Sequence, residues 1–137
     1  MQAVILAGGK GTRFGKLTKK IPKPMIKIGN KPIIWHILNH LSQQGIKQFI
    51  ICTGYKEKII RNYLSSIKEN WTAGCVYTGL NTLTGKRVGM ISKYIKEDFF
   101  LMTYGDGVSN ISLKSLIKNN KKKNKIATVT AVSPVPR

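Results

Sequence analysis

The sequence predicts an α/β fold in which helices cover both faces of a mostly parallel sheet. Short apolar runs alternate along the chain with helical patterns of apolar residues, and this alternation is typical of parallel sheets. The first apolar run leads directly into a glycine-rich loop, and ligands of such sheets bind beyond the carboxyl ends of the strands. With 137 residues, of which 42% are hydrophobic, the chain is long enough for one domain with its own core.

Apolar runs predict the strands. Their ranges are 2–7, 47–53, 73–78, 99–104 and 126–132. Apolar residues three or four positions apart predict the helices. These lie at 31–44, around 59–67, in a short stretch after Gly85 and from residue 113, where Ser112 is a candidate N-cap.

The net charge of +19 is unusual, because 24 Lys and Arg residues face only five acidic residues. Such a charge attracts anions, among them nucleotides, sugar phosphates and nucleic acids. The lysines are spread along the chain and arginine, the usual reader of guanine, is scarce, so we expect no specific nucleic-acid partner. The densest basic run, 121–123 with Lys125, follows a predicted helix and is interpreted as a solvated helix end.

No apolar run approaches the roughly 20 residues of a membrane span, and the apolar start is too short for a signal-peptide core. We therefore expect a cytoplasmic protein with no membrane partner. Cys52 and Cys75 lie in apolar runs and are expected to be buried free thiols. His36 and His40 lie off the apolar stripe of their helix and match no metal-binding pattern, so neither is expected to bind a metal.

The loop after the first predicted strand contains Gly8, Gly9, Gly11, Thr12 and Arg13. Glycines let a loop bend sharply and let a ligand approach its backbone closely. The loop matches neither the Walker pattern, which needs Lys and Ser or Thr after the last glycine, nor the dinucleotide pattern, which needs an acid about 20 residues on. Backbone N–H groups, the Thr12 hydroxyl and Arg13 could hold an anion there, and a plain strand-to-helix turn is the alternative.

Two further residues are candidates for the same edge of the sheet. Lys23 stands between Pro22 and Pro24, which fix the backbone and favour extended geometry in the residues before them. So stiff a segment suits a lysine that must point in one direction, although a surface bend is the alternative. Asp106 lies between two glycines directly after a predicted strand, so it should share an edge with the glycine loop.

The motifs LAGGKGTR at 6–13, PKPM at 22–25 and GNKPI at 29–33 resemble the opening of the sugar-1-phosphate nucleotidylyltransferases. Within that family, WHI at 35–37, GYK at 54–56, NTLTG at 81–85 and TYGDGV at 103–108 look most like the glucose-1-phosphate cytidylyltransferases. The resemblance covers essentially the whole chain and is highly specific, because both halves of the opening signature occur at the right separation.

The resemblance implies a Rossmann-like, GT-A-like fold and an enzyme of nucleotide-sugar biosynthesis, such as that of the lipopolysaccharide O-antigen. Family members transfer a nucleotidyl group to a sugar 1-phosphate, release pyrophosphate and use Mg²⁺. For this chain the implied substrates are CTP, or another nucleoside triphosphate, and glucose 1-phosphate. Such a transfer depends mainly on positioning and on neutralising charge.

The resemblance also implies roles for individual residues. Arg13 and Lys23 would be catalytic, with Arg13 on the triphosphate and Lys23 neutralising phosphates near the reacting centre. Asp106 would hold Mg²⁺ through oxygen, as a hard cation requires. The residues expected to contact nucleotide or substrate are Leu6, Ala7, Gly8, Gly9, Lys10, Gly11, Thr12, Arg13, Lys23, Thr82, Arg87 and Gly105.

The chain departs from the family in three ways. It is considerably shorter and has no acidic residue after Asp106, the segment 70–78 is shorter than in the cytidylyltransferases, and Lys86 replaces a glycine. We therefore expect residues 1–137 to be a truncated, nucleotide-binding part that is a poor catalyst alone and could form a homo-oligomer through an uncovered edge. The alternative is a non-catalytic nucleotide-binding remnant or an interaction module.

Overall fold

A parallel sheet forms the centre of the protein, and the predicted fold class is confirmed. The computed structural model describes residues 1–11 and 20–133. The sheet order is β5-β4-β1-β6 and every neighbouring pair is parallel. The strands are β1 (Gln2–Leu6), β4 (Gln48–Thr53), β5 (Thr72–Tyr77) and β6 (Leu101–Tyr104).

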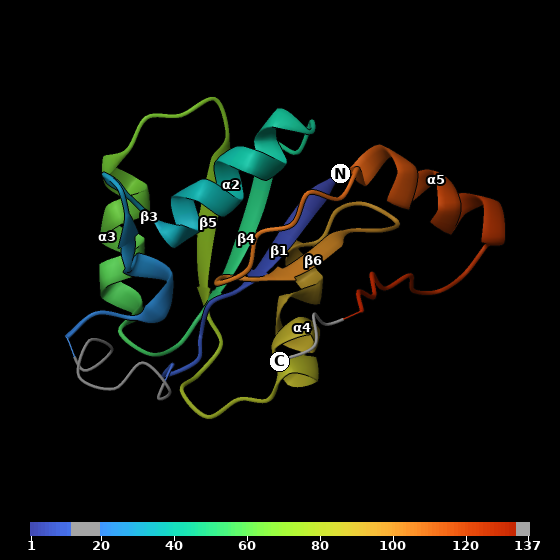
Figure 1. Ribbon diagram of the computed structural model, residues 1–137. Coiled ribbons are helices and arrows are strands. Elements are labelled where there is room, and N and C mark those ends of the chain that lie inside the picture. Colours follow the sequence, from blue (N-terminus) through green and yellow to red (C-terminus); the bar gives the residue numbers. More distant parts are fainter. Residues whose placement is uncertain (12–19, 134–137) are drawn as a thin grey trace.

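Helices cover both faces of this sheet (Figure 1). They are α2 (Ile33–Gln43), α3 (Glu57–Ser66), α4 (Thr84–Ile91) and α5 (Leu113–Lys123). One buried cluster joins one side of β1 to α2, α3 and the start of α5, and a second cluster joins the other side of β1 to α4. In the described part of the chain, three helices therefore pack on one face and one helix on the other.

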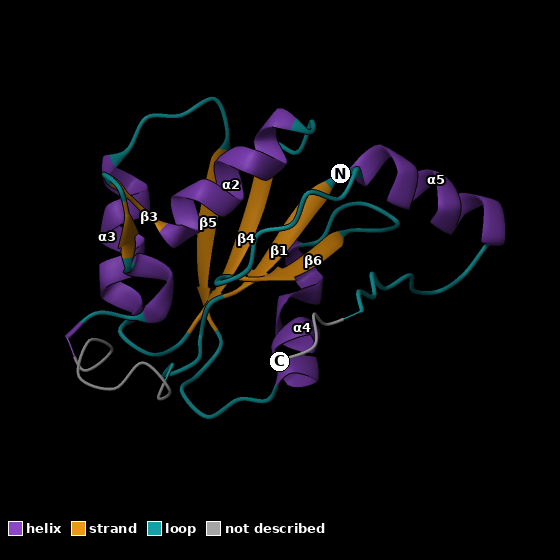
Figure 2. Cartoon of the chain, viewed as in Figure 1, coloured by secondary structure: helices purple, strands orange, loops and turns teal. Residues whose placement is uncertain are grey.

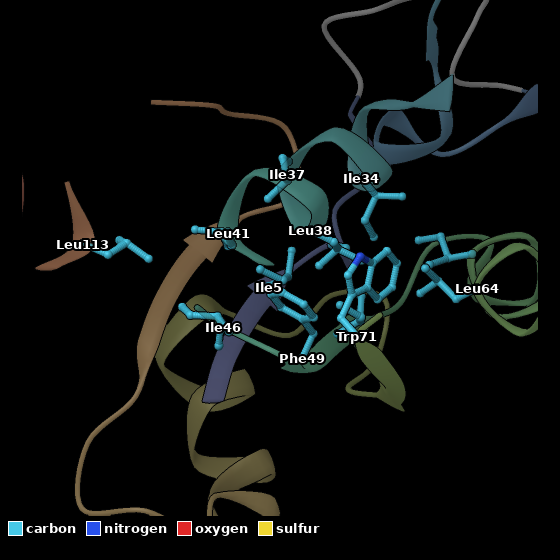
Figure 3. Close-up of a cluster of buried hydrophobic side chains, with 14 residues drawn as sticks. Ile5, Ile34, Ile37, Leu38, Leu41, Ile46, Phe49, Leu64, Trp71 and Leu113 are labelled. Carbon is cyan, nitrogen blue, oxygen red and sulfur yellow. The ribbon is translucent and has the colours of Figure 1, made fainter. Parts of the chain in front are cut away.

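The position of β1 explains its sequence. All five of its residues are buried, so after Gln2 it reads as a continuous apolar run, 3–6, rather than as an alternating one. Figure 3 shows Ile5 in the larger of the two buried clusters, directed toward Leu38 of α2, with Phe49 and Trp71 close by. The rings of Phe49 and Trp71 meet edge to face, with centroids 5.7 Å apart, a favourable arrangement for aromatic pairs.

The register of the strands decides where a ligand could bind. Leu6 at the end of β1 pairs with Cys52 on one side and with Tyr104 on the other. The loops that follow β1, β4 and β6 therefore leave the sheet at one edge, and Figure 2 shows them gathering where the strands converge. This is the carboxyl edge, at which parallel sheets bind their ligands.

Two sequence predictions are wrong. The segment 126–132 forms no strand, because a strand needs a neighbour for its backbone hydrogen bonds and nothing pairs with this segment in the described ranges. Its residues Ile126 and Val129 are exposed. Lys23 is not extended: η2 (Lys23–Met25) is a 3₁₀ turn, in which Met25 N donates to Pro22 O at 2.8 Å.

Smaller elements complete the structure. The stretch predicted as a short helix after Gly85 is α4 followed by η3 (Ser92–Tyr94). A two-stranded hairpin of β2 (Lys27–Ile28) and β3 (Lys31–Pro32), which was not predicted, turns at Gly29 with φ of 62°. The predicted cap is confirmed, since Ser112 Oγ accepts from Ser115 N at 3.3 Å.

The loops at the carboxyl edge pack so closely that one glycine there has no room for a side chain. A Cβ on Gly54 would collide with the carbonyl oxygen of Gly79 and would lie 2.7 Å from that of Gly8. Backbone atoms cannot move aside as a flexible side chain could. We therefore predict that Gly54→Ala lowers the free energy of unfolding by about 1–3 kcal/mol, measured by urea denaturation.

Gly74→Ala is the matched control for that variant. Gly74 lies within β5, and a Cβ there would meet nothing within 4 Å. The free energy of unfolding of this variant should stay unchanged or rise by up to about 1 kcal/mol, because alanine costs less backbone entropy than glycine. Equal losses in the two variants would contradict the close packing described for Gly54.

Candidate functional site

The loops at the carboxyl edge enclose an open pocket of about 420 Å³, a size common for small-molecule sites. The structure brings most of the predicted site residues to its wall. They are Leu6, Ala7, Gly8, Gly9, Gly11, Lys23, Thr82, Arg87, Gly105 and Asp106. Lys10 is exposed and is not part of the wall, and Thr12 and Arg13 lie outside the described residues.

Five further residues, which sequence reasoning did not select, line the pocket. They are Pro24, Leu80, Asn81, Thr84 and Tyr104. Each lies within two residues of a predicted one, so proximity to the motifs was the available signal. Tyr104 is more than half exposed although it ends a strand, which leaves its ring free to meet a ligand.

The glycine loop is anchored by backbone hydrogen bonds on both sides. Ala7 N donates to Cys52 O at 2.9 Å, Tyr55 N donates to Gly8 O at 3.1 Å, and Gly105 N donates to Leu6 O at 2.9 Å. These bonds extend the sheet pairing by one residue beyond β1. Residues 6–8, at the start of the loop, are thus held between β4 and β6.

Arg87 of α4 lies beneath the glycine loop and is only 6% exposed. Its Nε donates to Thr82 O at 3.0 Å, and its Nη1 donates to Thr78 Oγ1 at 2.6 Å and to Thr53 O at 3.3 Å. Its Nη2 donates to Leu80 O at 3.5 Å. These acceptors are neutral, so they satisfy the N–H groups without cancelling the charge.

No carboxylate in the described part of the chain forms an ion pair with Arg87. A buried cation without a counter-ion attracts an anion strongly, because little water screens it. Its guanidinium also fills the space where a Cβ of Gly8 would stand. The positive charge therefore lies directly against the backbone that faces the pocket.

Lys23 and Asp106 form an ion pair in the wall of the pocket. Lys23 Nζ lies 2.5 Å from Asp106 Oδ2, and the two side chains are 22% and 38% exposed. One comes from η2 and the other from the glycine-flanked turn after β6, so 83 positions in the sequence separate them. Each partner is thus placed where it could instead contact a phosphate or a cation.

The fit of Asp106 to a metal ion follows from its donor chemistry. Among the described residues no three of His, Cys, Asp and Glu cluster together. Mg²⁺ does not need such a cluster, because it is commonly bound by one or two carboxylates together with substrate phosphates and water. One carboxylate beside the glycine loop therefore suits Mg²⁺ that arrives together with a phosphate-bearing ligand.

The cysteines and histidines do not line this pocket. Cys52 is buried as expected, whereas Cys75 is only half-buried. His36 Nε2 lies 3.0 Å from Ile28 O, and His40 Nε2 lies 3.0 Å from Gln44 Nε2.

Burial raises the pKa of Cys52 from its ordinary value of 9.0 to about 11, and the charge of Arg87 lowers this pKa by a smaller amount.

The comparison with known families decides the identity of this site. The Nucleotidyl transferase family matches residues 2–136. The chain belongs to that family. Its pocket, with a glycine loop, a lysine and an aspartate at the carboxyl edge, is therefore the candidate nucleotide site of a Nucleotidyl transferase fold.

Named relatives use several nucleotides. The chain is 42% identical to glucose-1-phosphate cytidylyltransferase of Salmonella typhimurium, and the alignment covers 100% of the chain and 62% of the relative. It is 35% identical to D-glycero-alpha-D-manno-heptose 1-phosphate guanylyltransferase of Campylobacter jejuni, over 89% of the chain and 55% of the relative. The chain spans less than two thirds of the length of either relative.

A solved structure has the same fold over most of this chain. HddC from Yersinia pseudotuberculosis, complexed with GMP-PN, superposes with a TM-score of 0.75 at 30% sequence identity, over 87% of this chain and 53% of that one.

As for membranes, no helix in the described ranges of this Nucleotidyl transferase is both long and apolar enough to span a bilayer.

The raised pKa of Cys52 gives a prediction for alkaline pH. The folded state holds the thiol proton of Cys52 more tightly than the unfolded state does. The contribution of this thiol to the free energy of unfolding is therefore complete below pH 9 and is lost as the pH rises through about 11. The unfolding free energy should therefore fall more steeply from pH 9 to 11 in the unchanged chain than in Cys52→Val. The two curves should diverge by about 2–3 kcal/mol in urea titrations; parallel curves would contradict the assigned burial effect.

Proposed function

We propose that the pocket binds a nucleoside triphosphate and that the protein transfers its nucleotidyl group to a sugar 1-phosphate. The observation that supports this most directly is the charge of Arg87 against the glycine loop, with no carboxylate paired to it in the described residues, in a pocket that Lys23 and Asp106 also line. Two cations, together with a carboxylate that suits Mg²⁺, fit a ligand with several phosphates. The 42% identity to a glucose-1-phosphate cytidylyltransferase favours CTP and glucose 1-phosphate as the pair.

In the proposed reaction an oxygen of the sugar phosphate attacks the α-phosphorus of the nucleotide. The bond between the α-phosphorus and its bridging oxygen breaks, and pyrophosphate leaves with the electron pair. Negative charge grows on the leaving phosphates, so fixed cations beside them lower the barrier. Lys23 can supply one such cation once it exchanges Asp106 for a phosphate oxygen.

The backbone of the glycine loop and the sequence-predicted Thr12 and Arg13 would hold the triphosphate. Asp106 would hold Mg²⁺, which when bound neutralises phosphate charge. Tyr104 and Asn81 line the same pocket and are placed to meet the nucleoside or sugar. We further propose that the protein works in the cytoplasm in nucleotide-sugar biosynthesis.

Nucleotide binding tests the proposal by calorimetric titration of the chain with CTP, UTP, dTTP and GTP, with and without Mg²⁺. We expect CTP with Mg²⁺ to bind most tightly. Preference for another base would keep the site and remove the cytidylyl assignment. No heat with any nucleotide at millimolar concentration would contradict the nucleotide site itself.

Variants in the same titration separate the two charged partners. Lys23→Ala should weaken CTP binding by roughly 10-fold or more, since it removes a charge-assisted contact. Asp106→Asn should instead abolish the gain from Mg²⁺. His36→Ala is the control and should bind CTP as the unchanged chain does, because its imidazole contacts a backbone carbonyl of the hairpin outside the pocket wall.

Release of pyrophosphate from CTP and glucose 1-phosphate tests the transfer. Binding asks less of the site than turnover, because turnover also requires the attacking oxygen to be aligned with the α-phosphorus. CTP binding without pyrophosphate release would favour a nucleotide-binding module over an enzyme.

A further inference from the structure

The contacts of Arg87 depend on a threonine that no motif singles out. Thr78 directly follows β5 and is fully buried. Its Oγ1 donates to Thr53 O at 2.9 Å. A threonine hydroxyl has one hydrogen, so once that hydrogen is donated only lone pairs remain on the oxygen. The oxygen can then only accept, and the donor it accepts from is Arg87 Nη1, at 2.6 Å.

This bond is the shortest of those that hold the guanidinium. The other three acceptors are backbone carbonyls at 3.0, 3.3 and 3.5 Å. The donors on Nε and Nη1 and one donor on Nη2 are thereby used, which leaves one Nη2 N–H without an acceptor in the described part of the chain. That N–H and the charge are what Arg87 can still offer to an anion.

The orientation of the guanidinium matters because of its place against Gly8. A Cβ on Gly8 would lie 2.5 Å from Cζ of Arg87 and 3.0 Å from its Nη2. A rotation of the group would therefore either press on the glycine loop or withdraw the charge from it. Of the acceptors of Arg87 among residues 1–11 and 20–133, Thr78 alone provides a side-chain atom, so it can be changed without altering the backbone.

We propose that Thr78 is a positioning residue of the nucleotide site, whose hydroxyl fixes the guanidinium of Arg87 against the glycine loop. This inference rests on the proposed function. It predicts that the hydroxyl acts on nucleotide affinity through Arg87 and not through the stability of the fold.

A second buried threonine provides a matched control. Thr53 is also fully buried at the carboxyl edge, and its Oγ1 donates to Val76 O at 3.1 Å. Arg87 bonds to the backbone carbonyl of Thr53, not to its hydroxyl. Thr53→Val therefore removes a buried hydroxyl hydrogen bond of the same kind without removing an acceptor of Arg87.

The test is calorimetric titration of CTP with Mg²⁺ into the chain and its variants, with urea denaturation of each. Thr78→Val should weaken binding roughly 10-fold or more, because a charged donor loses its shortest acceptor. Thr78→Ser keeps the hydroxyl and should bind within about threefold of the unchanged chain. Thr53→Val should bind within about threefold as well, although both valine variants lose stability.

A double variant tests whether the effect passes through Arg87. Arg87→Lys alone should weaken CTP binding, and adding Thr78→Val should weaken it little further, since the two changes remove one shared interaction. If Thr78→Val does not fold, Thr78→Cys takes its place, because a thiol has nearly the shape of the serine hydroxyl and is a weak acceptor.

The outcomes separate this inference from the proposed function. Equal affinities in the Thr78→Val and Thr53→Val chains, or additive losses in the double variant, would overturn the positioning role while Arg87→Lys still showed that the site binds nucleotide. No CTP binding by the unchanged chain would overturn the proposed function and this inference with it.

Discussion

The buried guanidinium of Arg87 is the interaction on which the site depends. It bonds to the last residue of β4 and to the loop after β5, and it lies against the first glycine after β1. Three segments that are far apart in the sequence thereby meet at one group. A neutral side chain of another shape could not replace it, because it would supply neither the positive charge nor the set of N–H donors that reaches Thr82 O, Thr78 Oγ1 and Thr53 O together.

The same group gives the site its electrostatic character. Its acceptors are neutral oxygens, so its charge remains available to a ligand. Lys23 differs, because its charge is balanced by Asp106 until a ligand arrives. A nucleotide together with Mg²⁺ would supply an anion for Lys23 and a cation for Asp106 at once. Breaking the Lys23–Asp106 ion pair costs less free energy when both residues gain new partners at once than when one of them is left as an unpaired charge.

The fold and much of the site could be predicted from the sequence because local patterns decide them. Gly8 and Asp106 follow apolar strands, and parallel strands end at one edge, so periodicity alone brings the two together. The 3₁₀ turn at Lys23 and the failure of 126–132 to form a strand depend on packing and on a pairing partner, which no local pattern contains. The role of Thr78 likewise exists only once Arg87 is placed beside it.

A two-dimensional ¹H–¹⁵N NMR titration of the labelled chain with CTP and Mg²⁺ tests directly whether the nucleotide binds at the carboxyl edge. Binding there should shift the amide signals of Gly8, Gly9 and Gly105 and the side-chain Nε signal of Arg87 together, with saturation at one affinity. Shifts confined to the lysine-rich end of α5 would instead show that the nucleotide meets only the general positive charge of the surface, and would contradict a built site at the carboxyl edge.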